Sequence, residues 1–276
     1  MAITAQDVNK LRKMTGAGMM DCKKALTESE GDFEKAIDIL RKKGQKVSAS
    51  RADRETSEGS VFVKTNNDNT EGVLIALNCE TDFVGKNEGF LALGNNILEV
   101  AFAESPATVE ELMALSLDGL TISDKITEMV GKIGEKLEIS SYVRMSADQV
   151  VPYIHAGNKL GVLVGLSNTN GSDQTEAGRD VAMQIAAMNP IAVGKDSVPQ
   201  DVIARELEIG KDQARAEGKP EQMIDKIAEG KLNKFFAENT LLAQKFVKDN
   251  GVTIEKYLDS VSKGLTVSQF ERISIG

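Results

Sequence analysis

The chain has 276 residues, of which 41% are hydrophobic and 27% are charged, and its formal net charge is −9 at pH 7. This size and composition predict a globular protein of two or three compact units and exclude a disordered chain. The acidic balance argues against direct nucleic-acid binding, because affinity for phosphates needs clustered Lys and Arg.

Residues 1–45 predict three short helices. Thr4 suits the N-cap of the first helix, with Asp7 in its first turn, and a glycine-containing segment at 15–18 separates it from the second. The apolar residues of each segment recur at helical spacing and would form one small core. We therefore expect an N-terminal three-helix domain with the pattern of a ubiquitin-associated domain.

The third helix has Asp32 as its N-cap, and Gly44 is expected to end it. Residues 46–58 are polar and poor in large apolar side chains, which predicts a linker or a weak extension of the helix. The short basic run Arg41–Lys43 is interpreted as a solvated helix end, and a nucleic-acid contact is the less favoured alternative.

Residues 59–148 predict a first α+β subdomain. Two apolar runs at 60–65 and 72–77 flank a turn of Asn and Asp residues at 66–69, which is typical of an antiparallel hairpin. Helical spacing of apolar residues follows between positions 90 and 133. We expect these helices to pack on the hairpin.

The same order of elements recurs in a second α+β subdomain, predicted over 149–196 and 237–276. The strand-like runs Gly72–Ile75 and Gly161–Val164 lie 89 residues apart, and each is followed by a helix. The fold class is therefore predicted to be α+β, with a duplicated core of antiparallel sheets and packed helices.

Residues 197–236 interrupt the second subdomain with two long, charged, helix-favouring segments joined near Gly218–Pro220, which predicts an inserted helical hairpin. Its apolar spacing is too irregular for a heptad assignment. Self-association through this hairpin and a role as a solvated arm both remain open.

A glycine-kinked turn leads into the second helix, and two Met side chains lie where that helix begins. Flexible, polarisable Met suits a protein-binding surface, although both could equally belong to the core. The segment reads Thr15-Gly16-Ala17-Gly18-Met19-Met20-Asp21-Cys22-Lys23-Lys24-Ala25-Leu26.

A second segment leaves the end of a strand and precedes a helix: Asn78-Cys79-Glu80-Thr81-Asp82-Phe83-Val84. Thr81 or Asp82 can cap a helix and Phe83 can be a core residue, which is the simpler interpretation. The alternative is an aromatic side chain presented outward beside a carboxylate on a rigid frame.

Together these two segments and the order of the predicted parts resemble the elongation factor Ts family over nearly the whole chain. The resemblance implies guanine-nucleotide exchange on elongation factor Tu, the GTPase that delivers aminoacyl-tRNA to the ribosome in translation elongation. It also implies a protein of the cytoplasm that is not an enzyme and carries no cofactor or metal.

The resemblance assigns roles to particular residues. Thr81, Asp82, Phe83 and Val84 would approach the GTPase domain, where Phe83 would act as a wedge near the Mg²⁺ and phosphate site. Arg12, Met19 and Met20 would contact the same domain elsewhere. His155 and its surroundings, in the second subdomain, would contact another domain of the partner.

Two features depart from the family pattern. Gln184 stands where a His is expected, which would alter one contact. The chain ends at Gly276, soon after the strand-like run 270–275, without the additional C-terminal helical module of some members.

The sequence offers little for other functions. It contains one His and two Cys, with no spacing typical of a metal site and no phosphate-binding loop, and the first residues lack a signal peptide. No apolar run is long enough to cross a membrane. The remaining alternative is a non-catalytic adaptor that binds another protein through its three-helix domain.

Overall fold

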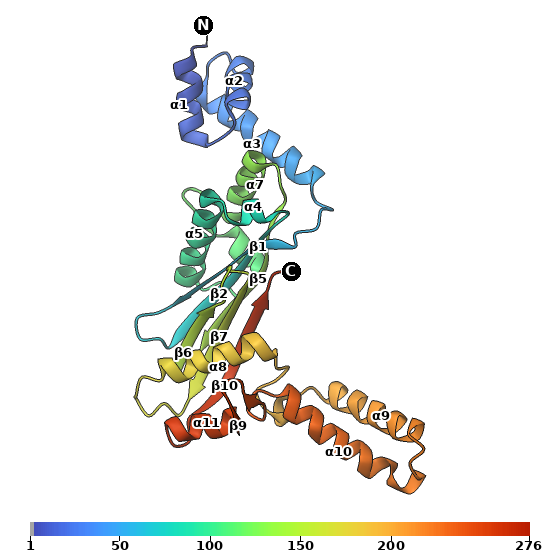
Figure 1. The fold of residues 1–276 in the computed structure, drawn as a ribbon. Helices are drawn as coiled ribbons and strands as arrows, with labels where there is room; N and C mark the ends of the chain where they lie inside the picture. The colour runs from blue at the N-terminus through green and yellow to red at the C-terminus, as the bar shows by residue number, and fades with distance from the viewer. Residues whose placement is uncertain (1–2) are drawn as a thin grey trace.

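The computed structural model describes residues 3–276 and shows an elongated molecule, with the N-terminal helices at one end and a helical hairpin projecting near the other (Figure 1). Residues 1 and 2, which belong to the predicted 1–45 domain, lie outside the described range. Within 3–276, no helix has the length and apolar character that crossing a membrane requires. The predicted domain boundaries stay a prediction.

The N-terminal part consists of α1 (Ala5–Thr15), α2 (Met19–Glu28) and α3 (Phe33–Ser50). The predicted cap of α1 is confirmed, because the Thr4 side chain accepts from the Asp7 N–H while Asp7 accepts from the Thr4 N–H. The three helices enclose a small core of their own, made of Val8, Leu11, Cys22, Ala25, Leu26 and Ala36.

The prediction that Gly44 ends the third helix was wrong, since α3 continues to Ser50. Gly44 lies where α3 crosses α7 (Ile122–Ile133), and a Cβ atom added at Gly131 of α7 would lie 2.8 Å from the Gly44 Cα. The two glycines therefore permit a close helix crossing, which joins the N-terminal helices to the first half of the core.

The first half contains an antiparallel sheet in the order β1-β2-β5, formed by Glu58–Thr65, Glu71–Cys79 and Leu137–Ser146. The predicted hairpin β1-β2 is confirmed, whereas β5 was not predicted. The helices α5 and α7 cover one face of this sheet (Figure 1). The elements between β2 and β5 are α4 (Asp82–Gly85), α5 (Glu88–Glu104), α6 (Val109–Ala114), β3 (Ser116–Leu117), β4 (Leu120–Thr121) and α7.

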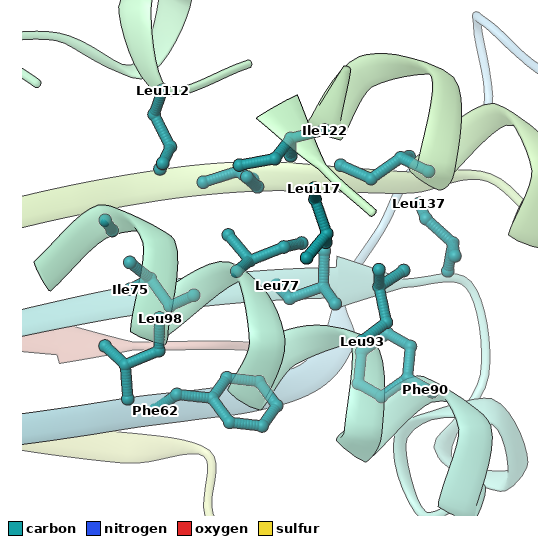
Figure 2. Packing of buried hydrophobic residues seen from close by; sticks show 14 of the residues in the cluster. Phe62, Ile75, Leu77, Phe90, Leu93, Leu98, Leu112, Leu117, Ile122 and Leu137 are labelled. Carbon is teal, nitrogen blue, oxygen red and sulfur yellow. The ribbon is translucent and has the colours of Figure 1, made fainter. Parts of the chain in front are cut away.

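The core of this half lies between the sheet and its helices, where the labelled side chains of Figure 2 point toward one another. Ile75 and Leu77 extend from the central strand, and Phe90 and Leu93 extend from α5. Phe62 lies against Gly94 of α5, where an added Cβ would come within 2.1 Å of the Phe62 ring. The glycine thus lets α5 pack directly on β1.

The second half repeats this arrangement with a sheet in the order β10-β7-β6. Its strands are Gln149–Ile154 (β6), Leu160–Ser167 (β7) and Thr266–Ser274 (β10), and α8 (Thr175–Met188) covers it. A small hairpin and a capped helix precede the last strand, as β3, β4 and α7 do in the first half. They are β8 (Lys245–Phe246), β9 (Asp249–Thr253) and α11 (Ile254–Val261).

The duplication is confirmed by contacts that repeat at the same offset of 89 residues as the sequence pattern. The Val61 N–H donates to the Asn158 carbonyl at 2.7 Å, and the Val150 N–H donates to the Asn69 carbonyl at 2.5 Å. Each partner of the first bond lies 89 positions from the corresponding partner of the second. The two halves are therefore related by an approximate two-fold axis.

The two sheets pack face to face across this axis. Gly72 approaches Val150, and Gly161 approaches Val61, so that added Cβ atoms would come within 2.8 and 2.5 Å of the respective methyl groups. Side chains alternate in direction along a strand, and those of β2 and β7 are buried on both faces. The core consequently has four layers, in the order helices, sheet, sheet and helices.

The predicted hairpin is confirmed as α9 (Gln200–Ala216) and α10 (Glu221–Asn239), preceded by the short 3₁₀ helix Lys195–Ser197. Its helices approach closely at Gly210, where an added Cβ would lie 3.2 Å from the Ala228 Cα. Ion pairs such as Lys211–Asp225, at 3.4 Å, connect the two helices. The hairpin projects away from the four-layer core (Figure 1).

Candidate functional site

The second sequence segment forms the one-turn helix α4 (Asp82–Gly85), directly after the central strand of the first sheet. The Phe83 side chain is 84% exposed, whereas its neighbour Val84 is buried in the core of the first half. The interpretation of Phe83 as a core residue was therefore wrong. The turn presents an aromatic ring to solvent and is anchored by the next side chain.

Two glycines allow this turn to lie against the start of β1. Gly59 has φ +141°, and an added Cβ would lie 2.2 Å from the Leu77 carbonyl oxygen. Gly85 packs on the Gly59 backbone, and its carbonyl accepts a hydrogen bond of 3.2 Å from the Ser60 hydroxyl. The base of the turn is thus fixed to backbone of the sheet.

Residues distant in sequence hold the start of the turn. The Thr81 N–H and hydroxyl both donate to the Glu135 carboxylate, at 3.0 and 2.7 Å. The preceding residue, Glu80, accepts from the Arg51 guanidinium at 3.0 Å and from the Lys136 N–H at 2.7 Å. Glu80 was part of the segment singled out from the sequence, but the contacts of Glu80 and Thr81 with Arg51, Glu135 and Lys136 were not predicted, because no local pattern links positions so far apart.

Asp82 belongs to a group of alternating charges beside the exposed ring. It accepts from Lys86 at 2.7 Å, and this hydrogen bond, with the charge of Lys86 and a smaller effect of Lys159, lowers the pKa of the Asp82 carboxyl. Lys159 in turn pairs with Glu58 at 2.5 Å. These ionised side chains surround an open groove beside the turn.

The groove joins the two halves of the core. It has a volume of about 550 Å³, and its walls include Asp82 and Lys86 from the first half and Ala156–Lys159 from the hairpin turn of the second. His155 comes directly before that stretch, is exposed, and has its Nδ1 atom 2.9 Å from the Tyr153 hydroxyl. The fold therefore places the His155 turn across a groove from the Phe83 turn.

The other predicted contact residues lie on the N-terminal helices. Met19 and Met20 begin α2 and are 53% and 73% exposed, so the alternative that both belong to the core was wrong. Arg12 is exposed near the end of α1. Met14 on the same helix is exposed as well, which its helical position alone did not show.

The two thiols of the chain are both enclosed by the fold. Cys22 and Cys79 are both buried, and burial raises the pKa of the Cys79 thiol to about 12, so Cys79 is not a nucleophile at neutral pH. Among residues 3–276, no group of His, Cys, Asp and Glu side chains is arranged to hold a metal ion. An exposed ring on an anchored turn is suited to insertion into another protein.

Comparison with known proteins gives the family. A model of the family described as "Elongation factor TS" matches residues 80–276. The chain belongs to the elongation factor Ts family. It is 62% identical over 274 residues to "Elongation factor Ts" of Cytophaga hutchinsonii, with 99% of both chains covered, and 57% identical over 276 residues to that of Amoebophilus asiaticus, with 100% of both covered.

Gln184, the position at which the resemblance led us to expect a His, has a structural role in this chain. Gln184 lies in α8, is fully buried, and donates to Gln244 and to the Lys245 carbonyl, both at 3.1 Å. Its oxygen accepts from the Val247 N–H at 2.9 Å. A side chain enclosed in this way is not available to a partner in the described fold.

Proposed function

We propose that this member of the elongation factor Ts family is a guanine-nucleotide exchange factor for elongation factor Tu, acts in the cytoplasm and catalyses no covalent reaction. The observation that carries the proposal is the exposed Phe83 ring, held by buried Val84 on a turn fixed to the sheet. A large exposed aromatic on a rigid frame is a common anchor of protein interfaces.

The exchange follows from reciprocal coupling between two ligands of one partner. If binding of this chain weakens the hold of elongation factor Tu on GDP, GDP weakens its hold on this chain by the same factor. Thr81, Asp82, Phe83 and Val84 would enter the partner near its Mg²⁺ and phosphate site, where displacing one ligand removes several contacts to the nucleotide.

The size of the effect can be estimated from the ring. A buried Phe contact is typically worth about 3–5 kcal/mol in a protein core, and about 2.7 kcal/mol corresponds to a hundredfold change in rate. A wedge of this kind is therefore sufficient for a GDP release about 100-fold faster. It requires no acid, base or nucleophile from this chain.

Other exposed residues would hold the partner while the wedge acts. Arg12, Met19 and Met20 would contact the domain that carries the nucleotide, and the His155 turn would contact another domain. In support, both Met side chains and His155 are exposed, and the His155 turn lies beside the Phe83 turn. Holding the partner at two places fixes the direction in which the wedge enters.

The proposal is tested by mixing this chain with elongation factor Tu that carries fluorescent GDP and recording nucleotide release by stopped flow. Phe83→Ala is expected to abolish most of the acceleration. Val261→Ala is a matched control, because Val261 is an exposed apolar residue of α11, distant from the turn, and should leave the rate unchanged.

The alternative adaptor function predicts a different outcome. An adaptor would bind through the three-helix domain without accelerating GDP release, so a wild-type chain with no effect on release would reject exchange. Equal rates for Phe83→Ala and the wild type would retain exchange and reject the wedge. Self-association through α9 and α10 stays a prediction, which sedimentation of the isolated protein would test.

A further inference from the structure

Thr81 occupies the N-cap position of α4 without capping it. Its backbone is extended, with φ −127° and ψ 154°, but its side chain accepts no hydrogen bond from the helix. A Thr at this position usually accepts from an N–H of the first turn. Here the Thr81 hydroxyl and N–H both donate to Glu135, so one carboxylate engages the group that would otherwise cap the helix.

The direction of α4 therefore depends on contacts outside the helix. A segment of four residues is far too short to be a stable helix by itself. Val84 anchors the turn in the core, and Gly85 fixes its C-terminal end against Gly59 and Ser60, but neither contact holds the residue that precedes the helix. Glu135 supplies the attachment at that residue, Thr81, on the N-terminal side of the turn.

Glu135 is itself held on a rigid part of the first half. It follows Gly134, which ends α7 in the left-handed conformation with φ 81°, and it precedes β5. Leu137, the first residue of β5, pairs with Cys79, the last residue of β2. The carboxylate thus extends from a segment tied to the same strand end that leads into the Phe83 turn.

A parallel attachment holds the preceding residue. Glu80 accepts from the Lys136 N–H and from Arg51, which follows the last residue of α3. Residues 80 and 81 are therefore bound by residues 136 and 135, a two-by-two clamp that connects the Phe83 turn to the end of α7. Arg51 adds a connection to the N-terminal helices.

We propose that Glu135 is a positioning residue for exchange, and that it sets the direction of Phe83 through its two hydrogen bonds to Thr81. This inference rests on the proposed function. Without the carboxylate, Thr81 is released to cap α4, the turn loses one attachment, and Phe83 spends less time in the direction that enters the partner. The exposed surfaces that hold the partner are unchanged, so binding should persist while release slows.

The test compares Glu135→Ala with Glu135→Gln, which differ in the hydrogen bonds that they can make to Thr81. Glu135→Ala removes both acceptors, and the maximal rate of GDP release should fall roughly tenfold, the effect of losing hydrogen bonds to a charged group. The concentration for half-maximal acceleration should change by less than about twofold. Glu138→Ala is the control, because Glu138 lies in β5 and bonds to Thr56 and Lys136 instead of the turn.

Glu135→Gln should retain most of the rate. Its amide oxygen can accept from the Thr81 N–H, and its amide NH₂ can donate to the Thr81 hydroxyl, so the attachment survives without the charge. A loss with Gln as large as with Ala would instead show that the charge acts directly on the partner. That outcome would overturn the positioning role.

Two further measurements separate positioning from general destabilisation. Hydrogen exchange of the Thr81 amide should be faster in Glu135→Ala, while the amides of β2 stay protected. In a Phe83→Ala background, Glu135→Ala should have no further effect on the rate, because it acts through the ring. Additive effects, or a Glu135→Ala chain as fast as wild type, would reject the inference and leave exchange intact. A wild-type chain that does not accelerate release would reject exchange itself.

Discussion

Gly131→Ala should separate the two helices that join the N-terminal part to the core. The added Cβ of residue 131 would lie 2.8 Å from the Gly44 Cα, whereas non-bonded carbon atoms prefer about 3.5–4.0 Å. The atom in the way belongs to backbone, which cannot turn aside as a side chain can. The helices α3 and α7 must therefore move apart by about 1 Å.

Two opposing effects set the magnitude of this change. Alanine favours a helix interior over glycine by about 1 kcal/mol, whereas overpacking a close contact typically costs about 1–3 kcal/mol. We therefore expect Gly131→Ala to lower the free energy of unfolding by about 1 kcal/mol. Gly230→Ala in α10 is the matched control, because its Cβ would meet nothing within 4 Å and only the gain of about 1 kcal/mol remains.

The assay is urea unfolding of both variants followed by circular dichroism, together with hydrogen exchange of the α3 amides. The free energies of unfolding of the two variants should differ by about 2 kcal/mol. Hydrogen exchange of the α3 amides should be faster only in Gly131→Ala. If Gly131→Ala stabilises the chain as much as Gly230→Ala, the close helix crossing is refuted.

Three other predictions concern single side chains. Burial raises the pKa of Cys79 to about 12. Alkylation of Cys79 at pH 8 should therefore be roughly a thousandfold slower in the folded chain than in the urea-unfolded chain. Equal alkylation rates by mass spectrometry would contradict this prediction. The pKa of the Asp82 carboxyl should lie below its ordinary value of 3.8, because Lys86 stabilises the carboxylate. This stabilisation of the fold is therefore complete above pH 3.8 and is lost as the pH falls through the lowered pKa. In Lys86→Gln, the Asp82 pKa measured by NMR should be higher than in the wild type. Gln184→Ala leaves the buried Gln244 side chain without its hydrogen-bond donor and the Val247 N–H without its acceptor, and should lower the free energy of unfolding in urea by about 1–3 kcal/mol; a wild-type midpoint would contradict the role of these hydrogen bonds.

Local sequence was sufficient wherever local physics decides. The cap of α1 at Thr4, the hairpin turns and the helical hairpin were predicted because caps, turn residues and helical periodicity act within a few positions. The duplication was visible for the same reason, as two similar strands 89 residues apart. The match of short, specific segments also indicated the family before any fold was known.

The sequence was less informative where distant segments meet. β5 was missed because its pairing with β2 is long-range, and Gly44 was assigned to a helix end although it marks a crossing. From local sequence alone, a glycine predicts the end of a helix, because local propensity cannot show that another helix passes within contact distance. The neighbour Gly131 supplies the reason, and it lies in a different element.

The same distinction between local sequence and tertiary structure applies to the candidate site. The sequence by itself determined that a Phe stands beside a carboxylate between a strand and a helix, which is a property of residues 78–84. Only the tertiary structure decided that Phe83 faces solvent and Val84 faces the core, and that Glu135 holds Thr81. Those outcomes depend on which surfaces the sheet and α7 already occupy, and burial is a competition among all segments of the chain, not a property of one.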